Sequence, residues 1–422
     1  MSSEPSRRTI LKTFALGASA ALMGRPALAQ TPARVIVIGG GFGGASCARE
    51  LQRNGLLVTL VESNPIFTAC PFSNAVIAGL RELKAQQFGY EALKKDGLAV
   101  VNQSAVGVDP QARRVTLADG LMLDYDRLVL SPGIDLRFDA LPGYAESATE
   151  TMPHAWKAGE QTTLLRRQLE AMADGGTVVM SAPANPFRCP PGPYERASLI
   201  AHYLKTRKPR SKLIVLDAKD AFSKQRLFEA AWRELYPGLI EWVGLSSGGK
   251  VTEVDPATKT FVTEFGSHEA DVANVIPPQR AGRIAAVAGV ADRTGWCPVD
   301  PTTFESRLQP NVHVIGDAAI MGGMPKSAFS ANAQAKVCAA AITSLLRGEA
   351  PPTPKLINTC YSLVAPDYGI SVAGVYRPAN GQLTDVEGAG GVSPADAPRS
   401  FRSLEATYAE AWFQTIAAEA FG

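Results

Sequence analysis

Apolar and polar residues near the start of the chain follow a strand, turn, helix and strand pattern. Residues 34–38 (RVIVI) are a run of five apolar-rich positions, which is typical of a buried strand. A glycine-rich turn follows this run, and the residues after the turn favour a helix up to about residue 53. A second apolar run, residues 56–61, ends at Glu62. The pattern predicts a βαβ unit of an α/β fold.

The turn between the predicted strand and helix has the spacing G-x-G-x-x-G at Gly39, Gly41 and Gly44. In such a turn the first glycine permits a tight bend, the second lets the backbone approach a pyrophosphate, and the third lets the helix pack on the sheet. Glu62 is placed to accept a hydrogen bond from a ribose hydroxyl. An ordinary glycine turn is the alternative, but the strand, helix and acid around it favour a dinucleotide. The predicted binding residues of the turn are Gly39, Gly41, Phe42, Gly43 and Gly44.

Two later segments resemble the remaining elements of a flavin site. Residues 125–133 are predicted to form a buried strand ending in a small-residue turn at Gly133. Residues 311–318 are predicted to form a strand that ends in Gly316-Asp317 before a helix, so that Asp317 can reach the ribityl hydroxyls or the phosphates of FAD. Either segment alone could be an ordinary strand and turn. In this order they indicate FAD in an oxidoreductase with two dinucleotide-type domains.

The βαβ rhythm repeats between these segments, with predicted strands at 177–181 and 212–217 and a helix at 193–205. A pyridine-nucleotide site should have its glycine turn after the first of these strands. Residues 182–195 contain no G-x-G-x-x-G and hold five prolines, which leave few N–H donors. We therefore predict that this region keeps the nucleotide-binding fold and binds no NAD(P)H.

The first 29 residues indicate the cellular compartment of the protein. Arg7 and Arg8 precede an apolar run at 14–23 and an A-x-A site at 27–29, which is typical of a twin-arginine export signal over residues 1–29. A plain secretory signal is the alternative and would lead to the same destination, the periplasm. No segment is long and apolar enough to predict a transmembrane helix.

Charge and cysteine spacing exclude several functions. The formal net charge of +2 and the lack of a dense basic stripe do not suggest nucleic-acid binding. The six cysteines include no C-x-x-C or C-x-x-C-H, so the usual zinc, thioredoxin-like and c-haem attachment signatures are missing. The four histidines lack metal-ligand spacing, and we predict no metal site.

Segments around the cysteines resemble the flavoprotein subunit of flavocytochrome c sulfide dehydrogenases. That family is related to sulfide:quinone oxidoreductases and, more distantly, to disulfide reductases such as glutathione reductase. The resemblance runs from about residue 33 to Gly422. The segments that carry it are 67–79, 187–198, 276–282, 295–300, 324–327 and 358–362.

The resemblance implies an α/β fold with two Rossmann-like domains and a C-terminal α+β domain. Its boundaries predict a discontinuous FAD-binding domain over 33–143 and 275–356, a degenerate NAD-binding-like domain over 144–274, and a C-terminal interface domain over 357–422. A helix is predicted at 404–420. Its face with Tyr408, Ala411, Trp412 and Ile416 is expected to pack on the body of the protein.

The resemblance also implies roles for three cysteines. Cys70 matches the cysteine that is joined to the 8α-methyl group of FAD through a thioether. Cys189 and Cys360 match the redox-active pair that faces the flavin, with Cys360 expected next to the ring and Cys189 as the exchanging sulfur. A structural disulfide is the alternative for this pair.

The remaining site residues have weaker support. By family context Lys326 is expected near the flavin pyrimidine, although a solvated lysine is also compatible. Glu195 is close to Cys189 in sequence and could exchange protons, with a surface salt bridge as the alternative. Cys47 and Cys338 are expected to be packing residues, and Cys297 a buried thiol.

Together these features imply a periplasmic sulfide dehydrogenase. The expected activity is oxidation of sulfide to polysulfide or sulfur through covalent FAD and a redox-active disulfide. Because the chain has no haem motif, the acceptor is expected to be a c-type cytochrome subunit in a heterodimer, with haem on that partner chain alone. A sulfide:quinone oxidoreductase, a flavoprotein of a thiosulfate-oxidising system, and a flavin-loaded protein without turnover remain as alternatives.

Overall fold

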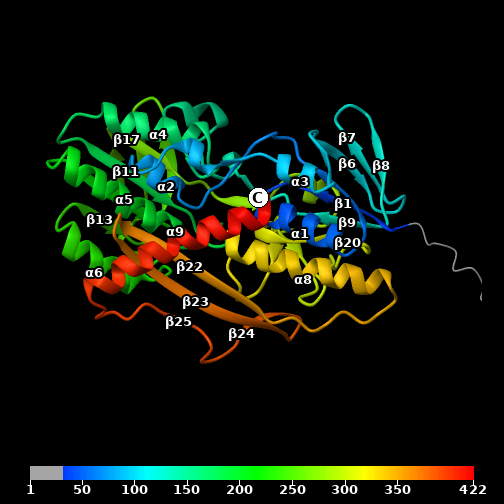
Figure 1. Cartoon of the computed structure of the whole chain (residues 1–422). Helices are drawn as coiled ribbons and strands as arrows, with labels where there is room; N and C mark the ends of the chain where they lie inside the picture. Colours follow the sequence, from blue (N-terminus) through cyan, green and yellow to red (C-terminus); the bar gives the residue numbers. More distant parts are fainter. Residues whose placement is uncertain (1–31) are drawn as a thin grey trace, which may run out of the picture. The chain divides into compact units, whose positions relative to one another are not determined.

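The computed structural model describes residues 32–422, a mixed α/β fold, and the predicted export signal at 1–29 lies outside the described residues. Within residues 32–422 no helix is both long enough and apolar enough to cross a bilayer. Three sheets, each with its own helices, make up most of the fold (Figure 1).

The first sheet has five parallel strands in the order β20-β9-β1-β2-β5. Its strands are β1 (Arg34–Ile38), β2 (Leu57–Val61), β5 (Ala99–Val101), β9 (Arg127–Leu130) and β20 (Val312–Val314). Strand β1 lies in the centre and is buried from its second residue onward, which explains why its sequence is apolar without alternation. Helix α1 (Phe42–Arg53) connects β1 to β2, and α8 (Ala328–Leu346) packs against α1 (Figure 1).

Short elements fill the connections of this sheet. Between β2 and β5 the chain forms β3 (Phe67–Thr68), α2 (Ser73–Ile77), the 3₁₀ turn η1 (Leu83–Gln86), β4 (Gln87–Phe88) and α3 (Glu91–Lys95). An antiparallel sheet of β6 (Ala105–Asp109), β7 (Arg114–Leu117) and β8 (Met122–Asp124) follows. After β9 come β10 (Ile134–Leu136), η2 (Phe138–Ala140) and η3 (Glu146–Glu150), and β10 pairs with the later strand β18 (Gln279–Ala281).

The second sheet is also parallel, in the order β13-β12-β11-β17. Its strands are β11 (Thr177–Ala182), β12 (Lys212–Asp217), β13 (Ile240–Val243) and β17 (Val272–Val275). Its helices are α4 (Glu160–Ala171), α5 (Gly192–Arg207) and α6 (Gln225–Leu235). The antiparallel strands β14 (Val251–Asp255), β15 (Thr260–Thr263) and β16 (Gly266–Glu269) follow the 3₁₀ turn η4 (Leu245–Ser247). This βαβ order is the one that the sequence predicts.

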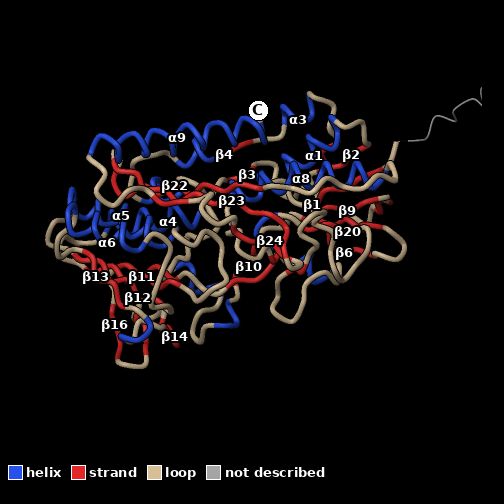
Figure 2. Tube along the Cα trace, turned by 90° about the horizontal axis from the view of Figure 1, so that it is seen from below, coloured by secondary structure: helices blue, strands red, loops and turns tan. Residues whose placement is uncertain are grey.

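The third sheet is antiparallel and contains the longest strands. It consists of β22 (Leu356–Ala365), β23 (Tyr368–Ala379), β24 (Gln382–Asp385) and β25 (Gly391–Val392). Helix α9 (Arg399–Phe421) lies along β22 and β23 and reaches α1 (Figures 1 and 2). The remaining short elements are α7 (Ile284–Val287), β19 (Cys297–Pro298), η5 (Gly316–Ala318) and β21 (Ala319–Ile320).

The order of strand, Gly316-Asp317 and helix is the one that the sequence predicts. The helix, α8, begins at Ala328, because the chain first forms the 3₁₀ turn η5 and Ser327 caps the helix by accepting a hydrogen bond from the N–H of Ser330. The predicted packing face of α9 is right only in part: Ile416 is buried and Trp412 packs against the core, but Ala411 is exposed. Tyr408 is 49% exposed, whereas the buried aromatic residues of α9 are Phe413 and Phe421.

Candidate functional site

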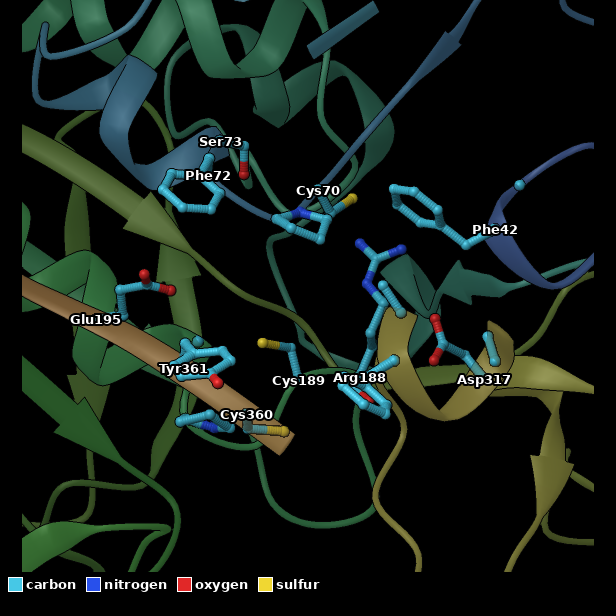
Figure 3. Close-up of a pocket in the computed structure, with 18 of the residues that line it drawn as sticks. Phe42, Cys70, Phe72, Ser73, Arg188, Cys189, Glu195, Asp317, Cys360 and Tyr361 are labelled. Carbon is cyan, nitrogen blue, oxygen red and sulfur yellow. The ribbon is translucent and has the colours of Figure 1, made fainter. Parts of the chain in front are cut away.

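A cavity lies where the ends of β1, the loop before α5, and strand β22 meet (Figure 3). It holds about 1300 Å³ of space between atoms, part of it open to solvent. Of the predicted site residues, the ones that line it are Gly41, Phe42, Gly43, Cys70, Gly133, Cys189, Glu195, Gly316, Asp317 and Cys360. The fold therefore brings together residues that are up to about 320 positions apart in sequence.

The glycine turn has the backbone geometry that its sequence requires. Gly39 has φ +99°, a region that side chains disfavour, and a Cβ on Gly44 would lie 1.8 Å from the carbonyl oxygen of Gly39. Gly41 is the N-cap residue of α1 and has no side chain that could cap it, so the first N–H groups of the helix are left for a ligand. Gly39 and Gly44 shape the turn from outside the cavity, while Gly41 lines it.

Glu62 contacts the same turn rather than the cavity. Its Oε2 accepts a hydrogen bond of 2.7 Å from the N–H of Gly40, and its Oε1 accepts one of 2.8 Å from the N–H of Asn64. The carboxylate thus fixes the turn to the end of β2. It keeps further lone pairs that can accept from a ribose hydroxyl, as predicted for this residue.

The carboxylate of Asp317 has a buried oxygen atom that could accept a hydrogen bond from a ligand. Its carboxylate faces the cavity in Figure 3, and its buried Oδ1 has no hydrogen-bond partner among the described residues. Burial raises the pKa of Asp317, against the opposing charges of Arg188 and Lys326. Buried polar atoms are nearly always paired, so this oxygen calls for a ligand donor such as a hydroxyl. The glycine turn and this acid together fit a dinucleotide that carries a polyhydroxy chain.

The three cysteines with predicted roles all lie in the wall of the cavity (Figure 3). The structure holds each of them as a free thiol. Cys189 has φ +57°, and its N–H donates to the carbonyl of Lys326 at 2.8 Å. The Sγ of Cys360 accepts a hydrogen bond of 3.2 Å from the side-chain amide of Asn358. Burial raises the pKa of the Cys189 thiol, and the neighbouring charges of Glu195 and Cys360 raise it further.

Glu195 lies on the first turn of α5 and faces the same cavity. Its Oε1 accepts from the N–H of Leu363 at 3.0 Å and its Oε2 from the amide of Asn74 at 3.2 Å. Burial raises the pKa of Glu195, while the bond from Leu363 and the charge of Lys224 oppose the shift. The residue is therefore part of the cavity wall and its position fits proton exchange with Cys189, rather than a surface salt bridge.

Lys326 does not line the cavity. Its Nζ donates hydrogen bonds of 2.7 Å to the carbonyls of Asp317 and Ala319 and lies 4.0 Å from the centre of the Trp296 ring. These contacts fix the turn that carries Asp317. Burial lowers the pKa of Lys326 to about 8, against the charge of Asp317. The Nζ of Lys326 binds the backbone of Asp317, which lines the cavity, and the expected proximity of Lys326 to the flavin pyrimidine stays a prediction.

The remaining cysteines pack in the interior. Cys47, Cys297 and Cys338 have no exposed surface. Burial raises the pKa of Cys297 to about 12 and also raises that of Cys338 well above its ordinary value, the latter with a contribution from the hydrogen bond to Cys47. Their burial agrees with the packing roles that the sequence indicates.

Sequence reasoning missed two cationic residues of the cavity wall. Arg188 precedes Cys189 and donates to the carbonyl of Trp156. Arg196 is 1% exposed, and within residues 32–422 its guanidinium donates hydrogen bonds to neutral oxygens alone, among them the carbonyl of His154 at 2.9 Å and the side chain of Asn74 at 3.0 Å. The position of Arg188 beside a cysteine was a usable signal. Nothing in the local sequence marked Arg196.

Three family models match the chain. The model described as "Sulfide dehydrogenase [flavocytochrome c] flavoprotein chain, central" matches residues 162–277, and "Flavocytochrome c sulphide dehydrogenase, flavin-binding" matches residues 352–421. The model described as "Pyridine nucleotide-disulphide oxidoreductase" matches residues 33–170. Together they cover each of the three sheets in part.

Proteins of similar sequence have names related to those of the family models. A flavocytochrome c sulfide dehydrogenase flavoprotein chain of Chlorobaculum thiosulfatiphilum is 58% identical over 45 residues, which is 10% of this chain and 94% of that sequence. A mitochondrial sulfide:quinone oxidoreductase of Dictyostelium discoideum is 24% identical over 68% of this chain, and a sulfide-quinone reductase of Aquifex aeolicus is 31% identical over 42% of it. The chain spans 65% and 41% of the lengths of these last two, less than two thirds of each.

Solved structures share the fold. The sulfide:quinone oxidoreductase from Aquifex aeolicus has a TM-score of 0.71 at 19% identity, with 92% of each chain covered. Putidaredoxin reductase, in its covalent complex with putidaredoxin, has a TM-score of 0.65 at 18% identity, covering 89% of this chain and 93% of that one. These likenesses confirm the predicted fold class of two dinucleotide-binding-type folds.

Proposed function

Because the chain belongs to the superfamily of flavocytochrome c sulfide dehydrogenase flavoprotein chains and sulfide:quinone oxidoreductases, we propose that it oxidises sulfide with a flavin and the sulfur pair Cys189 and Cys360. The observation that carries this proposal is the meeting of three cysteines, an unpaired buried acid and a glycine turn at one cavity. The domain boundaries drawn from the resemblance stay a prediction.

The residues of the cavity fit FAD. The N–H groups at the start of α1 would receive the pyrophosphate, and Asp317 would accept from ribityl hydroxyls. Cys70, whose Sγ lies in the cavity 3.7 Å from the carbonyl of Trp156, would form the thioether. FAD, when bound, accepts an electron pair from sulfur and releases electrons singly. The proline-rich loop after β11 gives no second dinucleotide site, which supports the proposal that NAD is not used.

The chain's own sulfurs would carry out the first step. In the oxidised pair, hydrosulfide attacks the sulfur of Cys189, a bond forms between the two sulfurs, and the Cys189–Cys360 bond breaks with its electrons left on Cys360 as a thiolate. Hydrosulfide is already a thiolate-like nucleophile at neutral pH. The proton on the resulting persulfide can pass to Glu195, which lies in the same wall.

The electron acceptor that we propose is a c-type cytochrome subunit in the periplasm, reached by twin-arginine export. The names of the two family models over 162–277 and 352–421 support it, as does the 58% identity to a flavocytochrome c subunit. Quinone is the second candidate, because the longer matches are to sulfide:quinone oxidoreductases. A role in a thiosulfate-oxidising system would use the same site with another cytochrome.

An anaerobic titration with sulfide tests these alternatives. The expected result is bleaching of the flavin absorbance by sulfide, followed by reoxidation on adding a c-type cytochrome and no reoxidation by a soluble quinone. Reoxidation by the quinone alone would reject the cytochrome assignment. A flavin that sulfide does not bleach would reject the enzymatic role and point to a flavin-binding protein without turnover.

A further inference from the structure

Lys224 is a buried lysine that the proposed reaction does not use. It directly precedes α6, is 9% exposed, and has φ +62°. Lysine is rarely buried, and a long side chain rarely adopts the left-handed backbone region. Such a conformation persists only where surrounding contacts determine it, so the contacts of this residue indicate what it does.

The hydrogen bonds of the Lys224 ammonium all go to the third sheet, and the ammonium also lies 5.7 Å from the centre of the Phe228 ring on α6. Its Nζ donates to the carbonyl of Cys360 at 2.9 Å, to the hydroxyl of Ser362 at 2.8 Å and to the carbonyl of Ile370 at 3.3 Å. These bonds account for all three N–H groups of the ammonium. The lysine thus ties the second sheet's helix α6 to strands β22 and β23 at the position of Cys360.

Strand geometry places this charge on the side of the thiol. Side chains alternate along a strand, so Asn358, Cys360 and Ser362 share one face of β22. The amide of Asn358 reaches the Sγ of Cys360, and the hydroxyl of Ser362 binds Lys224, which confirms the shared face. The ammonium therefore lies on the face that carries the Cys360 sulfur.

No carboxylate of residues 32–422 forms an ion pair with Lys224, and its three partners are neutral oxygens. The titratable and charged groups that influence it are Cys360, Glu195, Cys189 and Glu405. Burial lowers the pKa of Lys224 to about 8, so the ammonium stays mostly protonated at neutral pH. Its charge remains available to a new anion nearby.

We propose that Lys224 is a positioning residue that holds β22 in place and keeps a positive charge on the Cys360 face, where it stabilises the thiolate that forms on Cys360. The inference rests on the proposed sulfur exchange, in which the Cys189–Cys360 bond breaks and its electron pair stays on Cys360. Lys224 transfers no proton in this step; it offsets the charge of the leaving sulfur.

The test measures thiolate reactivity in the reduced, flavin-loaded protein without sulfide. The rate of alkylation of Cys360 by iodoacetamide near neutral pH is followed by peptide mass spectrometry. Removing a nearby opposite charge lowers the thiolate fraction, so Lys224→Met and Lys224→Gln should slow labelling on the order of tenfold. Lys224→Arg, which keeps the charge, should restore most of the rate.

Two control variants separate charge from structure. Lys205→Met removes an exposed ammonium that donates to the carbonyl of Leu235 at 2.7 Å, at the other end of α6, and should label at the wild-type rate. Ser362→Ala removes one bond to Lys224 but keeps the charge, and should also label near that rate. Equal slowing in Ser362→Ala would assign the effect to packing and overturn the proposal.

If iodoacetamide labels Cys360 at the wild-type rate in both Lys224→Met and Lys224→Gln, the proposed role of the Lys224 charge is wrong. Lys224→Gln keeps a hydrogen-bond donor, so the test survives if Lys224→Met does not fold. Because the assay uses no sulfide, its outcome is separate from the proposed function. The labelling of Cys360 could depend on Lys224 in a protein in which sulfide fails to bleach the flavin. That result would reject the proposed sulfide oxidation but would leave the proposed effect of the Lys224 charge on Cys360 intact.

Discussion

The carboxylate of Glu195 accepts a 3.0 Å hydrogen bond from the backbone N–H of Leu363. This bond joins helix α5, which follows Cys189, to strand β22 just after Cys360. The two walls of the cavity that carry the sulfur pair are therefore held together by an acid in a buried position. The amide of Asn74 binds the second oxygen and brings in α2, which follows Cys70.

We predict that Glu195→Gln changes the pH dependence of stability. Burial raises the pKa of Glu195 above its ordinary value near 4.3, so in the interval between these two values the folded protein holds a proton that the unfolded chain has released. The unfolding free energy of the wild type should therefore fall as pH rises through this interval, and the variant should lack that part of the fall. Urea unfolding at about pH 4.5 and about pH 7.5 measures it.

The control for this prediction is Glu253→Gln, which alters an exposed glutamate on β14. It should keep the wild-type pH dependence. If Glu195→Gln and the wild type lose the same free energy between the two conditions, the buried acid does not titrate as predicted.

Replacing either member of the sulfur pair should leave flavin bound but stop its reduction by sulfide. We expect Cys189→Ser and Cys360→Ser to slow anaerobic flavin bleaching on the order of 100-fold or more, because neither protein can form the disulfide that sulfide attacks. Stopped-flow absorbance gives the rate. Cys297→Ser, a buried thiol away from the cavity, serves as the control and should bleach normally. Near-normal bleaching in either pair variant contradicts the proposed exchange.

The Cys70→Ala variant tests the covalent link to the flavin. In the wild type the yellow chromophore should stay with the denatured polypeptide after acid precipitation, and the intact mass should exceed that of the polypeptide by one FAD. In the variant the flavin should pass into the supernatant, because the proposed thioether is absent. Flavin that stays with the denatured variant would place the linkage elsewhere.

Gly44→Ala should disrupt the glycine turn. The added methyl group would lie 1.8 Å from the carbonyl oxygen of Gly39, so α1 must move away from β1. We expect a loss of bound flavin, which is measured as a lower ratio of the visible flavin absorbance to the ultraviolet absorbance of the aromatic side chains. We also expect a loss of about 1–3 kcal/mol in unfolding free energy. The control Gly391→Ala adds its methyl group where no atom lies within 4 Å. Full flavin content in Gly44→Ala would contradict the role of the turn.

The sequence predicted those elements of the fold whose formation depends on residues close together in the chain. The first βαβ unit, β11 and β12 follow from apolar runs and glycine positions, because burial on both faces of a parallel strand leaves a visible signature. The family resemblance supplied the cysteines, which spacing alone could not connect. Lys224 and Arg196 escaped prediction because their hydrogen-bond partners lie on distant segments, which only the folded chain brings next to them.

The incomplete prediction of the buried face of α9 also arises from charged residues in the interior. Its aromatic residues suggested the buried face, yet Tyr408 is exposed while Glu405 is buried and forms a 3.3 Å ion pair with Arg402. A buried charge pair on the helix is invisible to a hydrophobic pattern. The pair makes Arg402 and Glu405 part of the interior, which the hydrophobic pattern alone assigns to apolar residues.

The end of α9 also bears on the order in which the protein can be completed. The ring of Phe421 stacks on those of Phe67 and Phe88, with centres 5.2 Å and 5.1 Å apart, and so covers the segment that leads to Cys70. On the ribosome, residues 67–88 emerge long before residues 399–421 do. Until translation reaches that helix, Phe67 and Phe88 lack their stacking contacts with Phe421, so the surroundings of Cys70 are complete only after the last residues have been made.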